Sequence, residues 1–161
     1  MAILSIHTRP AAVLRKKAKK VSSIDNAVQR LIDDMIATMR TASGVGLAAP
    51  QVGISLQIAV IEIPDEEVIT LINPEIIKTQ GECLLTEACL SIPGYQGQIK
   101  RSVKVKVKAQ DRQGKIFRIA GEELLAQALE HEIDHLNGIL YIDHLESPED
   151  LHQISLEDGQ M

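Results

Sequence analysis

The sequence is poor in aromatic residues and cysteine, and it has no long hydrophobic run. It contains no tryptophan, two tyrosines and one phenylalanine in 161 residues, so isoleucine, leucine, valine and alanine must fill the core. No apolar run approaches the roughly 20 residues needed to cross a bilayer, so we expect no membrane-spanning segment. Two cysteines, Cys83 and Cys89, are too few for a secreted disulfide scaffold. In a reducing compartment, a lone reactive thiol is more often a ligand or nucleophile than half of a bridge.

The N-terminus lacks the features of a targeting segment. The stretch "MAILSIHTRPAAVLRKK" has no basic start followed by an apolar core and a cleavage site, so we expect a cytoplasmic protein without a membrane partner. The formal net charge of −5 argues against a general nucleic-acid binder, and no DNA partner is expected. The one basic run, "RKKAKK" at residues 15–20, is interpreted as a solvated face, with a docking patch for RNA as the alternative.

The chain has the length of one domain, and we expect a single domain over residues 1–161. Apolar residues at helical spacing predict an amphipathic helix over residues 23–40, with Ser22 or Ser23 as its N-cap. The glycine-rich stretch "TASGVGLAAPQVG" then predicts a loop that feeds a buried strand in "LQIAVIEI". A second helix is predicted from near Glu122 to Gly138, where glycine can adopt the left-handed conformation.

Further short strands are expected in "VITLINPEII" and around "GECLLTEACLSIP". Valines alternate with lysines over residues 103–108, which is typical of a half-exposed antiparallel strand, and "IFRIA" is its predicted hairpin partner across the turn "DRQGK". The predicted fold class is therefore α+β, with short antiparallel strands packed around one central helix. An acidic tail, expected to be flexible, follows from about residue 146; it has five carboxylates and no lysine or arginine.

The second predicted helix carries His-Glu-x-x-His in "HEIDH". His131 and His135 are four residues apart and so return to one face of the helix, together with the apolar Leu124 and Ala128. A buried apolar face has no structural reason to contain two imidazoles, so the pattern predicts a bound metal. Glu132 lies roughly 100° around the helix from His131, which suits a general base beside the metal.

A catalytic metal usually has three protein ligands, and this helix supplies two. The extended metalloprotease motif has a further histidine where this chain has Tyr141, which excludes that subclass. His144, a distant glutamate and Cys89 are the candidates for the third ligand, and a thiolate is a strong ligand for borderline and soft cations. Cys83 is interpreted as an inert buried thiol.

Three ordered segments resemble the motifs of the peptide deformylase family: "GVGLAAPQ" at residues 44–51, "EACLS" at 87–91 and "HEIDH" at 131–135. "LINPEI", "SIPGYQG" and "LNGILYIDHL" extend the resemblance to about residue 145. The usual second motif has glycine where this chain has Ala88, a change that a backbone with negative φ tolerates. The acidic tail also departs from the family, because some bacterial deformylases end in a long basic helix associated with docking on ribosomal RNA.

The resemblance implies a hydrolase that removes the N-formyl group from the initiator methionine of newly made polypeptides and releases formate. Its partners would be N-formyl-methionyl nascent peptides and the ribosome. It implies one divalent ion, Fe²⁺ in the first place, with Zn²⁺, Ni²⁺ or Co²⁺ able to occupy the same ligands. The ligands would be Cys89, His131 and His135. Glu132 would handle protons, while Gln51 and the backbone N–H of Leu90 would form the oxyanion pocket.

The substrate pocket is inferred from small and apolar residues near these motifs. Backbone at Gly44, Val45 and Gly46 would wall the site closely enough to admit the hydrogen of a formyl group and obstruct the methyl of an acetyl group. Leu124 and Ala128, on the histidine face of the helix with Val45 opposite, would form the apolar hole for the methionine side chain.

Two other functions remain open. A zinc endopeptidase that cuts internal amides is weakened by the cysteine ligand, and a non-catalytic metal-binding domain would not need Glu132 or Gln51. A further open point concerns Glu87 and Arg101. They either pair to brace the turn that contains the candidate cysteine ligand, or they form a plain surface ion pair.

Overall fold

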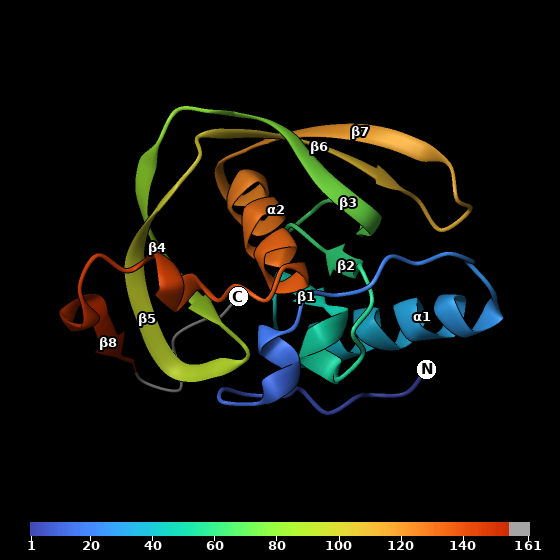
Figure 1. Cartoon of the computed structure of the whole chain (residues 1–161), viewed down its shortest axis with the longest axis horizontal. Coiled ribbons are helices and arrows are strands. Elements are labelled where there is room, and N and C mark those ends of the chain that lie inside the picture. The colour runs from blue at the N-terminus through green and yellow to red at the C-terminus, as the bar shows by residue number, and fades with distance from the viewer. Residues whose placement is uncertain (155–161) are drawn as a thin grey trace.

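The structure is a computed structural model in which residues 1–154 are described (Figure 1). Within that range it combines two α-helices with two antiparallel sheets, which confirms the predicted α+β class. The larger sheet has the strand order β1-β2-β3-β6-β7, and the smaller has the order β4-β5-β8. No helix among these residues is long and apolar enough to cross a membrane.

The elements follow in chain order. They are η1 (Ala12–Arg15), α1 (Asn26–Thr41), β1 (Gly46–Ala48), η2 (Ala49–Val52), β2 (Ile58–Ile61), β3 (Ile69–Gln80), β4 (Cys83–Cys89), β5 (Ile92–Arg101), β6 (Lys104–Gln110), β7 (Ile116–Glu122), α2 (Glu123–Leu136), η3 (Tyr141–His144), η4 (Pro148–Asp150) and β8 (Leu151–Gln153), where η marks a 3-10 helix.

Helix α1 begins later than the sequence predicted, and neither Ser22 nor Ser23 caps it. Asp25 is the N-cap: its backbone is extended, and its side chain accepts a hydrogen bond of 3.0 Å from the N–H of Val28. A carboxylate satisfies a free amide of the first turn as well as a serine hydroxyl does, so the later cap sets the start of the helix. The buried face of α1 packs against β1 and β2.

The predicted hairpin of β6 and β7 is confirmed, and its register explains the alternation of valine and lysine. Val105 and Val107 are buried, while Lys104 and Lys106 are exposed. Val103 differs from the expected pattern because it precedes β6 and remains 40% exposed. Strand β3 is a continuous run of 12 residues that pairs with both β2 and β6.

Several strands were not predicted. The segment expected to be a loop contains β1 and the 3-10 helix η2, because the backbone of β1 pairs with β2 in spite of its small residues. Strand β5 was missed because Pro93, Gly94 and Gly97 interrupt its alternation. Strand β8 pairs with β5, so the first part of the acidic tail belongs to the smaller sheet. The remainder of the expected flexible tail, residues 155–161, lies outside the described part of the chain.

Helix α2 closely matches its predicted range and packs against strands β1, β2, β3, β6 and β7 (Figure 1). Its apolar face joins a core cluster through Ala128, Leu129 and Ile133. Gly138, just beyond the helix, has a φ of +75°, and a β-carbon there would lie 2.7 Å from the carbonyl oxygen of Arg15. Glycine at this position therefore allows the N-terminal segment to pack directly against the end of the helix.

Candidate active site

Three buried side chains from separate parts of the sequence converge between β4 and α2. The Sγ of Cys89 lies 3.3 Å from the Nε2 of His135, which in turn lies 3.2 Å from the Nε2 of His131. A tetrahedral ion with bonds of about 2.0–2.3 Å would separate its ligand atoms by roughly 3.4–3.6 Å. The cluster thus has the dimensions of a mononuclear metal site. Of the three candidates for the third ligand, the structure brings Cys89 and not His144 to the histidines.

The end of β4 determines where the cysteine points. The pairing of β4 with β5 is irregular after Glu87, and Cys89 pairs with Ile92 to form a tight turn. Within the turn, the N–H of Ser91 donates a hydrogen bond of 3.4 Å to the Sγ of Cys89. Ala88 is buried and is not among the residues with positive φ, so the backbone accepts its methyl group as expected. Cys83 lies at the other end of β4 and is only half-buried, contrary to the expected buried thiol.

A buried carboxylate orients the first histidine. The Nδ1–H of His131 donates a hydrogen bond of 2.7 Å to Glu87, which leaves Nε2 facing the cluster. Burial lowers the pKa of His135 well below its usual value, so His135 is a neutral imidazole. Burial acts in the same direction on His131, but the charges of Cys89 and Glu132 outweigh it and raise the pKa of His131 well above its usual value. A cation that binds at Nε2 of His131 would therefore displace a proton. Thiol sulfur and two imidazole lone pairs at these short separations fit a shared cation. This donor set is the first indication that the residues present suit a metal ion.

The ion pair between Glu87 and Arg101 is interior, which excludes the surface interpretation. Arg101 donates two hydrogen bonds to Glu87, at 2.9 and 2.5 Å, and both side chains are almost fully buried. Burial alone would raise the pKa of Glu87, but hydrogen bonds from His131 and Arg101 outweigh it and lower that pKa to about 2. The Glu87 carboxylate therefore stays charged and holds both β4 and the histidine in place.

This network continues to the surface through Asp134 and through His144, which had been a candidate for the third ligand. Arg101 also donates to Asp134 at 2.8 Å, and Asp134 lies 2.8 Å from the Nε2 of His144. Gln127 donates to Glu87 at 3.2 Å. Gln127 stands four residues before His131 on the same helix face, and that spacing could have indicated its place beside the histidine.

Glu132 is fully buried, and neither of its carboxylate oxygens has a hydrogen-bond partner among residues 1–154. Burial raises the pKa of Glu132 to about 7. A β-carbon on Gly46 would lie 2.9 Å from the Cδ of Glu132, so the glycine makes room for this carboxylate. The sequence had instead suggested that glycine there serves a close approach of substrate. An unpaired buried carboxylate is costly and marks a functional group.

Gln51 connects the first motif to the second. Its Oε1 accepts a hydrogen bond of 3.0 Å from the N–H of Ala48, which fixes the orientation of the amide. Its Nε2 donates to the Oγ of Ser91 at 3.1 Å and lies 3.6 Å from the Sγ of Cys89. Leu90 lies in the adjoining turn, and a β-carbon on Gly44 would meet its side chain at 2.8 Å. Ser91 was not singled out from the sequence, although it belongs to the second motif.

The residues inferred for the side-chain pocket differ in exposure. Val45 is half-buried and packs against the core cluster that contains Ala128, which itself has no exposed surface. Leu124 is half-buried and belongs to none of the core clusters of the described chain. Val45 and Leu124 therefore offer accessible apolar surface, whereas Ala128 lies beneath it.

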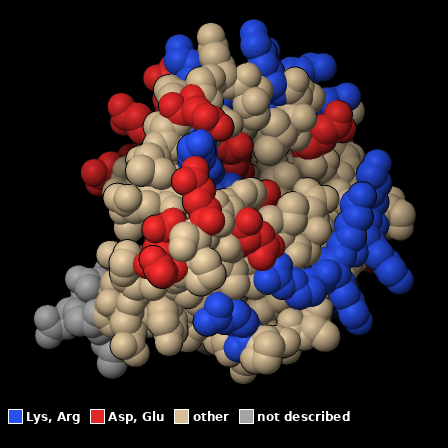
Figure 2. Space-filling model, turned by 60° about the vertical axis from the view of Figure 1, so that its left-hand side comes forward, with Lys and Arg blue, Asp and Glu red and all other residues tan. Residues whose placement is uncertain are grey.

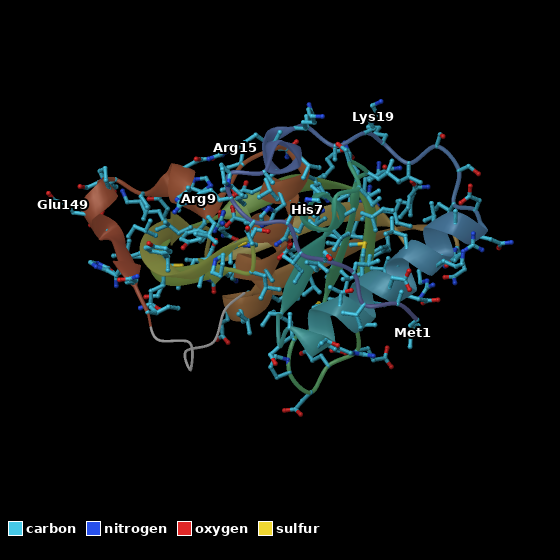
Figure 3. The ribbon with its side chains drawn as sticks, turned by 90° about the horizontal axis from the view of Figure 1, so that it is seen from below. Met1, His7, Arg9, Arg15, Lys19 and Glu149 are labelled. Atoms are coloured by element: carbon cyan, nitrogen blue, oxygen red, sulfur yellow. The ribbon has the colours of Figure 1, made fainter. Side chains whose placement is uncertain are left out.

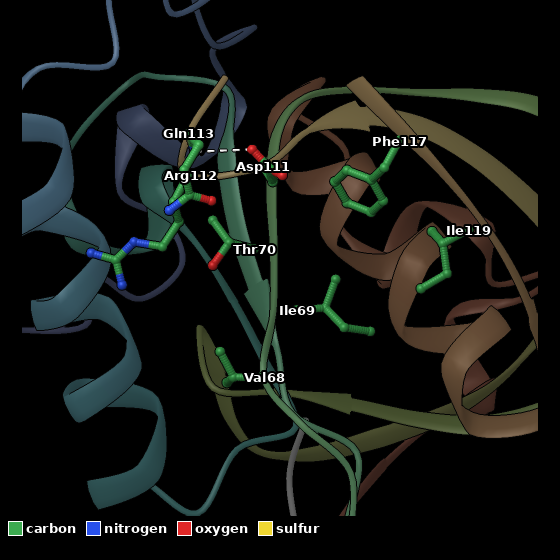
Figure 4. A pocket seen from close by; sticks show the side chains of 8 residues that line it. All are labelled: Val68, Ile69, Thr70, Asp111, Arg112, Gln113, Phe117 and Ile119. Atoms are coloured by element: carbon green, nitrogen blue, oxygen red, sulfur yellow. Dashed lines mark hydrogen bonds between the residues drawn. The ribbon is translucent and has the colours of Figure 1, made fainter. Parts of the chain in front are cut away.

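One large hollow lies away from the cluster, beside the turn between β6 and β7 (Figure 4). It measures about 390 Å³, and Phe117 and Ile119 form part of its apolar wall. The polar residues around it are engaged in the turn: Asp111 accepts from the N–H groups of Gln113 and Lys115, each at 2.9 Å. The hollow thus presents none of the chemistry found at the cysteine and histidines.

A Cys-His-His cluster beside an unpartnered buried glutamate is the arrangement expected of a metal-dependent hydrolase. Comparison with known proteins gives the particular family. The family described as polypeptide deformylase matches residues 3–150. A peptide deformylase of Dehalococcoides mccartyi is 58% identical over 159 residues, and the match covers 98% of this chain and 95% of the length of that relative. The chain belongs to the peptide deformylase family.

Solved structures agree with this assignment. A peptide deformylase from Legionella pneumophila superposes with a TM-score of 0.90 at 51% identity, over 92% of this chain and 89% of its own. An Acinetobacter baumannii peptide deformylase, bound to Met-Ala-Ser, superposes with a TM-score of 0.86 at 34% identity, over 89% of this chain and 99% of its own. The protein is an enzyme that removes the N-formyl group from newly made polypeptides, in a family of metalloenzymes whose usual metal is iron.

Proposed function

We propose that Cys89, His131 and His135 hold one divalent cation and that Glu132, Gln51 and Leu90 carry out deformylation at that centre. The observation that best supports this proposal is the buried carboxylate of Glu132, which has no hydrogen-bond partner among the described residues and is next to His131 in the sequence. Such a group is available to exchange protons with a reacting molecule, and a merely structural glutamate would be paired.

A divalent cation in this position supplies Lewis acidity and lowers the pKa of water towards neutrality. Glu132 takes a proton from the attacking water and later delivers it to the nitrogen of the leaving amine. A pKa raised to about 7 by burial suits both steps, since the carboxyl group can accept and release a proton near neutral pH. The products are formate and a free N-terminal amine.

Gln51 and the backbone N–H of Leu90 donate to the formyl oxygen as negative charge develops on it. Support for the role of Gln51 comes from its place beside the candidate ligand, with its Nε2 3.6 Å from the Sγ of Cys89. The hydrogen bond from Ala48 holds its amide in one orientation, so the donor is aimed before the substrate arrives. A fixed donor needs no reorganisation in the transition state.

Gly44, Val45 and Gly46 form the wall against which the formyl hydrogen fits, and Val45, Leu124 and Ala128 form the hole for the methionine side chain. Val45 and Leu124 would make the first contacts, because Ala128 is covered. An N-formyl-methionyl peptide is the proposed substrate. The Met-Ala-Ser peptide bound to the Acinetobacter baumannii relative has the sequence of a deformylated product of this kind.

Fe²⁺ is the proposed ion, with Zn²⁺, Ni²⁺ and Co²⁺ able to occupy the same three ligands. One sulfur and two imidazole nitrogens suit borderline divalent cations, and iron is the usual metal of the family. Helix α2, which carries both histidines and Glu132, is the central element of this proposal. Because nascent formylated chains are attached to ribosomes, we also propose that the enzyme works in the cytoplasm, beside the ribosome.

The proposal is tested by formate release from formyl-Met-Ala-Ser and from acetyl-Met-Ala-Ser, using protein purified without oxygen. We expect release of formate from the first peptide and no detectable cleavage of the second. Reconstitution of metal-free protein with Fe²⁺, Co²⁺ or Zn²⁺ in parallel measures how the rate depends on the ion. Cleavage of internal amides in an unformylated peptide, or equal activity on the acetylated peptide, would contradict the proposal.

A further inference from the structure

The basic run near the N-terminus forms a rigid exposed ridge. Lys16, Lys17, Lys19 and Lys20 are all exposed, and none of them forms an ion pair with a carboxylate of residues 1–154. Arg15, by contrast, pairs with Asp143. The four lysines thus present free positive charge, and the lack of local neutralisation distinguishes them from an ordinary charged surface.

Backbone hydrogen bonds hold this ridge in place. The N–H of Ala18 donates to the carbonyl of Leu136 at the end of α2, at 2.8 Å. Lys19 donates to the carbonyl of Ser55 at 3.0 Å and accepts from the N–H of Gln57 at 2.8 Å. Ala18 is buried between the lysines. The ridge is therefore a fixed part of the fold, and its side chains extend from a defined backbone (Figure 3).

A second set of cations lies on the outer face of the larger sheet. Lys106 of β6 stands directly opposite Lys78 of β3. Lys108 of β6 stands opposite Arg118 of β7 on one side and opposite Glu75 of β3 on the other. Like charges at opposing cross-strand positions are destabilising. The pair of Lys78 and Lys106 therefore has no structural benefit, and it indicates a surface kept positive for another purpose.

The two sets meet at one depression in the surface. Lys20 of the ridge and Lys108 of the sheet line the same hollow of about 190 Å³, together with Glu75 and the polar Asn73 and Gln110. We call the combined surface the basic band. Its members are Lys16, Lys17, Lys19, Lys20, Lys78, Lys106, Lys108 and Arg118.

The charges of the protein are segregated. The chain has 22 acidic and 17 basic residues, and Figure 2 shows many of the lysine and arginine side chains along the right-hand edge and top of the molecule. Most of the acidic side chains in this view lie over the centre and left, with a few basic groups among and below them. A protein with net charge −5 would be repelled by a polyanion at most orientations. The basic band concentrates cations that are unpaired among the described residues in one part of the surface, and so would orient the enzyme on its partner.

We propose that the basic band is the surface by which this enzyme docks on the phosphate backbone of ribosomal RNA. Successive outward-facing residues of a strand are about 6.6–6.8 Å apart, so β6 presents a ladder of cations to an extended polyanion. The partner follows from the activity, because the substrate is a newly made chain still attached to a ribosome. A membrane would call for aromatic anchors beside the cations, and β7 places its aromatic residue, Phe117, on the inner face.

The test compares two double variants with the same change of charge. Lys17→Glu with Lys106→Glu alters both halves of the basic band, whereas Arg30→Glu with Lys100→Glu alters exposed cations outside it. Each is mixed with purified bacterial 70S ribosomes and sedimented at KCl concentrations from roughly 50 to 200 mM. We expect the parent to bind with a salt-dependent affinity. The variant in the basic band should lose at least about tenfold in affinity and reduce the salt slope by about 2.

The control variant should bind like the parent, and all three proteins should keep the same kcat/KM on formyl-Met-Ala-Ser, since the substitutions lie outside the proposed catalytic residues. Equal loss in both variants, or no binding of the parent even at low salt, would overturn the docking proposal. So would binding to phosphatidylglycerol vesicles in place of ribosomes. Inactivity of the parent on the peptide would instead contradict the proposed function, so the two failures are distinguishable.

Discussion

Gly46 and Glu132 are packed so closely that no side chain fits between them. A β-carbon on residue 46 would meet the Cγ, the Cδ and a carboxylate oxygen of Glu132, the first at 3.0 Å and the second at 2.9 Å. The first motif therefore shapes the position of the proposed proton carrier on α2. Because the φ of Gly46 is not positive, the constraint on this residue is steric and does not come from backbone conformation.

Gly46→Ala should displace the Glu132 carboxylate while the three candidate ligands stay in place. We expect deformylation to fall by about 10²-fold or more, since small misplacement of a catalytic group is enough for such a loss. Metal content should remain near that of the parent. Gly44→Ala is the comparison for the position of Glu132, because the nearest atom to its methyl is the end of the Leu90 side chain at 2.8 Å and not the carboxylate. A loss of activity in Gly44→Ala would come from the proposed wall around the formyl group. A parental rate in Gly46→Ala would show that Glu132 tolerates the displacement.

Cys89→Ala should remove the metal, since two histidines alone bind a divalent ion poorly at a site built for three ligands. Cys83→Ala should retain it, because Cys83 lies at the far end of β4, where its thiol meets the carbonyl oxygen of Arg101 at 3.5 Å. Elemental analysis of both purified proteins decides between the cysteines. A loaded Cys89→Ala protein beside a metal-free Cys83→Ala protein would reverse the assignment.

Gln51→Leu should lower kcat by roughly 10²- to 10³-fold, the usual effect of losing one oxyanion donor. It should also lower stability by about 1–3 kcal/mol, because the buried N–H of Ala48 would lose its acceptor. Steady-state kinetics and denaturant unfolding separate the two effects. If kcat stays within about threefold of the parent while stability falls, Gln51 is only a packing residue.

His144 should make stability depend on pH. Its hydrogen bond to Asp134 raises its pKa above the usual 6.5, so the folded state binds the proton more tightly than the unfolded state. The resulting stabilisation is fully present below about pH 6.5 and is lost as the pH rises through the folded pKa. Thermal unfolding of the parent and of His144→Gln at about pH 5.5 and about pH 8.5 tests this. The difference between them should be larger at the lower pH, and a constant difference would contradict the prediction.

The sequence predicted elements best where hydrophobic periodicity is strong. Helix α2 was found because its histidines and apolar residues recur at helical spacing, and the hairpin of β6 and β7 was found because valine and lysine alternate in β6. Strands β1 and β5 were missed because glycine and proline hide their pattern, and pairing with the neighbouring strands β2 and β4 stabilises them. The start of α1 was misplaced because serine and aspartate are equivalent caps in sequence, and tertiary packing selects between them.

The same distinction applies to the site. The residues that converge at Cys89 and the two histidines could be inferred from motifs, but the partners that orient them could not. Glu87 and Arg101 left two interpretations open, since spacing along the chain does not say whether an ion pair is buried. The hydrogen bonds that link Arg101 to Asp134 and Asp134 to His144 join β5, α2 and the turn after α2. No local pattern in the sequence specifies this tertiary arrangement.

Glu132→Gln gives the sharpest test, because a hydrolase and a metal-binding module disagree about this residue. Glutamine keeps the shape of the side chain and leaves Cys89, His131 and His135 unchanged, but it cannot take a proton from water. We expect a folded protein with parental metal content. Its rate of formate release should fall by at least the 10²- to 10⁴-fold typical of a lost general acid–base, since one residue serves both proton transfers.

A structural role for Glu132 predicts the opposite pattern. If Glu132 were structural, Glu132→Gln would change the rate of formate release only modestly, and the stability or the metal content of the protein would fall instead. Neither carboxylate oxygen has a hydrogen-bond partner in the described structure, so the variant removes no contact of that kind. Formate release, metal content and thermal unfolding measured on one preparation therefore separate the two roles. Full metal occupancy together with near-parental formate release would overturn the proposed mechanism. The attacking water would then lose its proton to a group other than the Glu132 carboxylate.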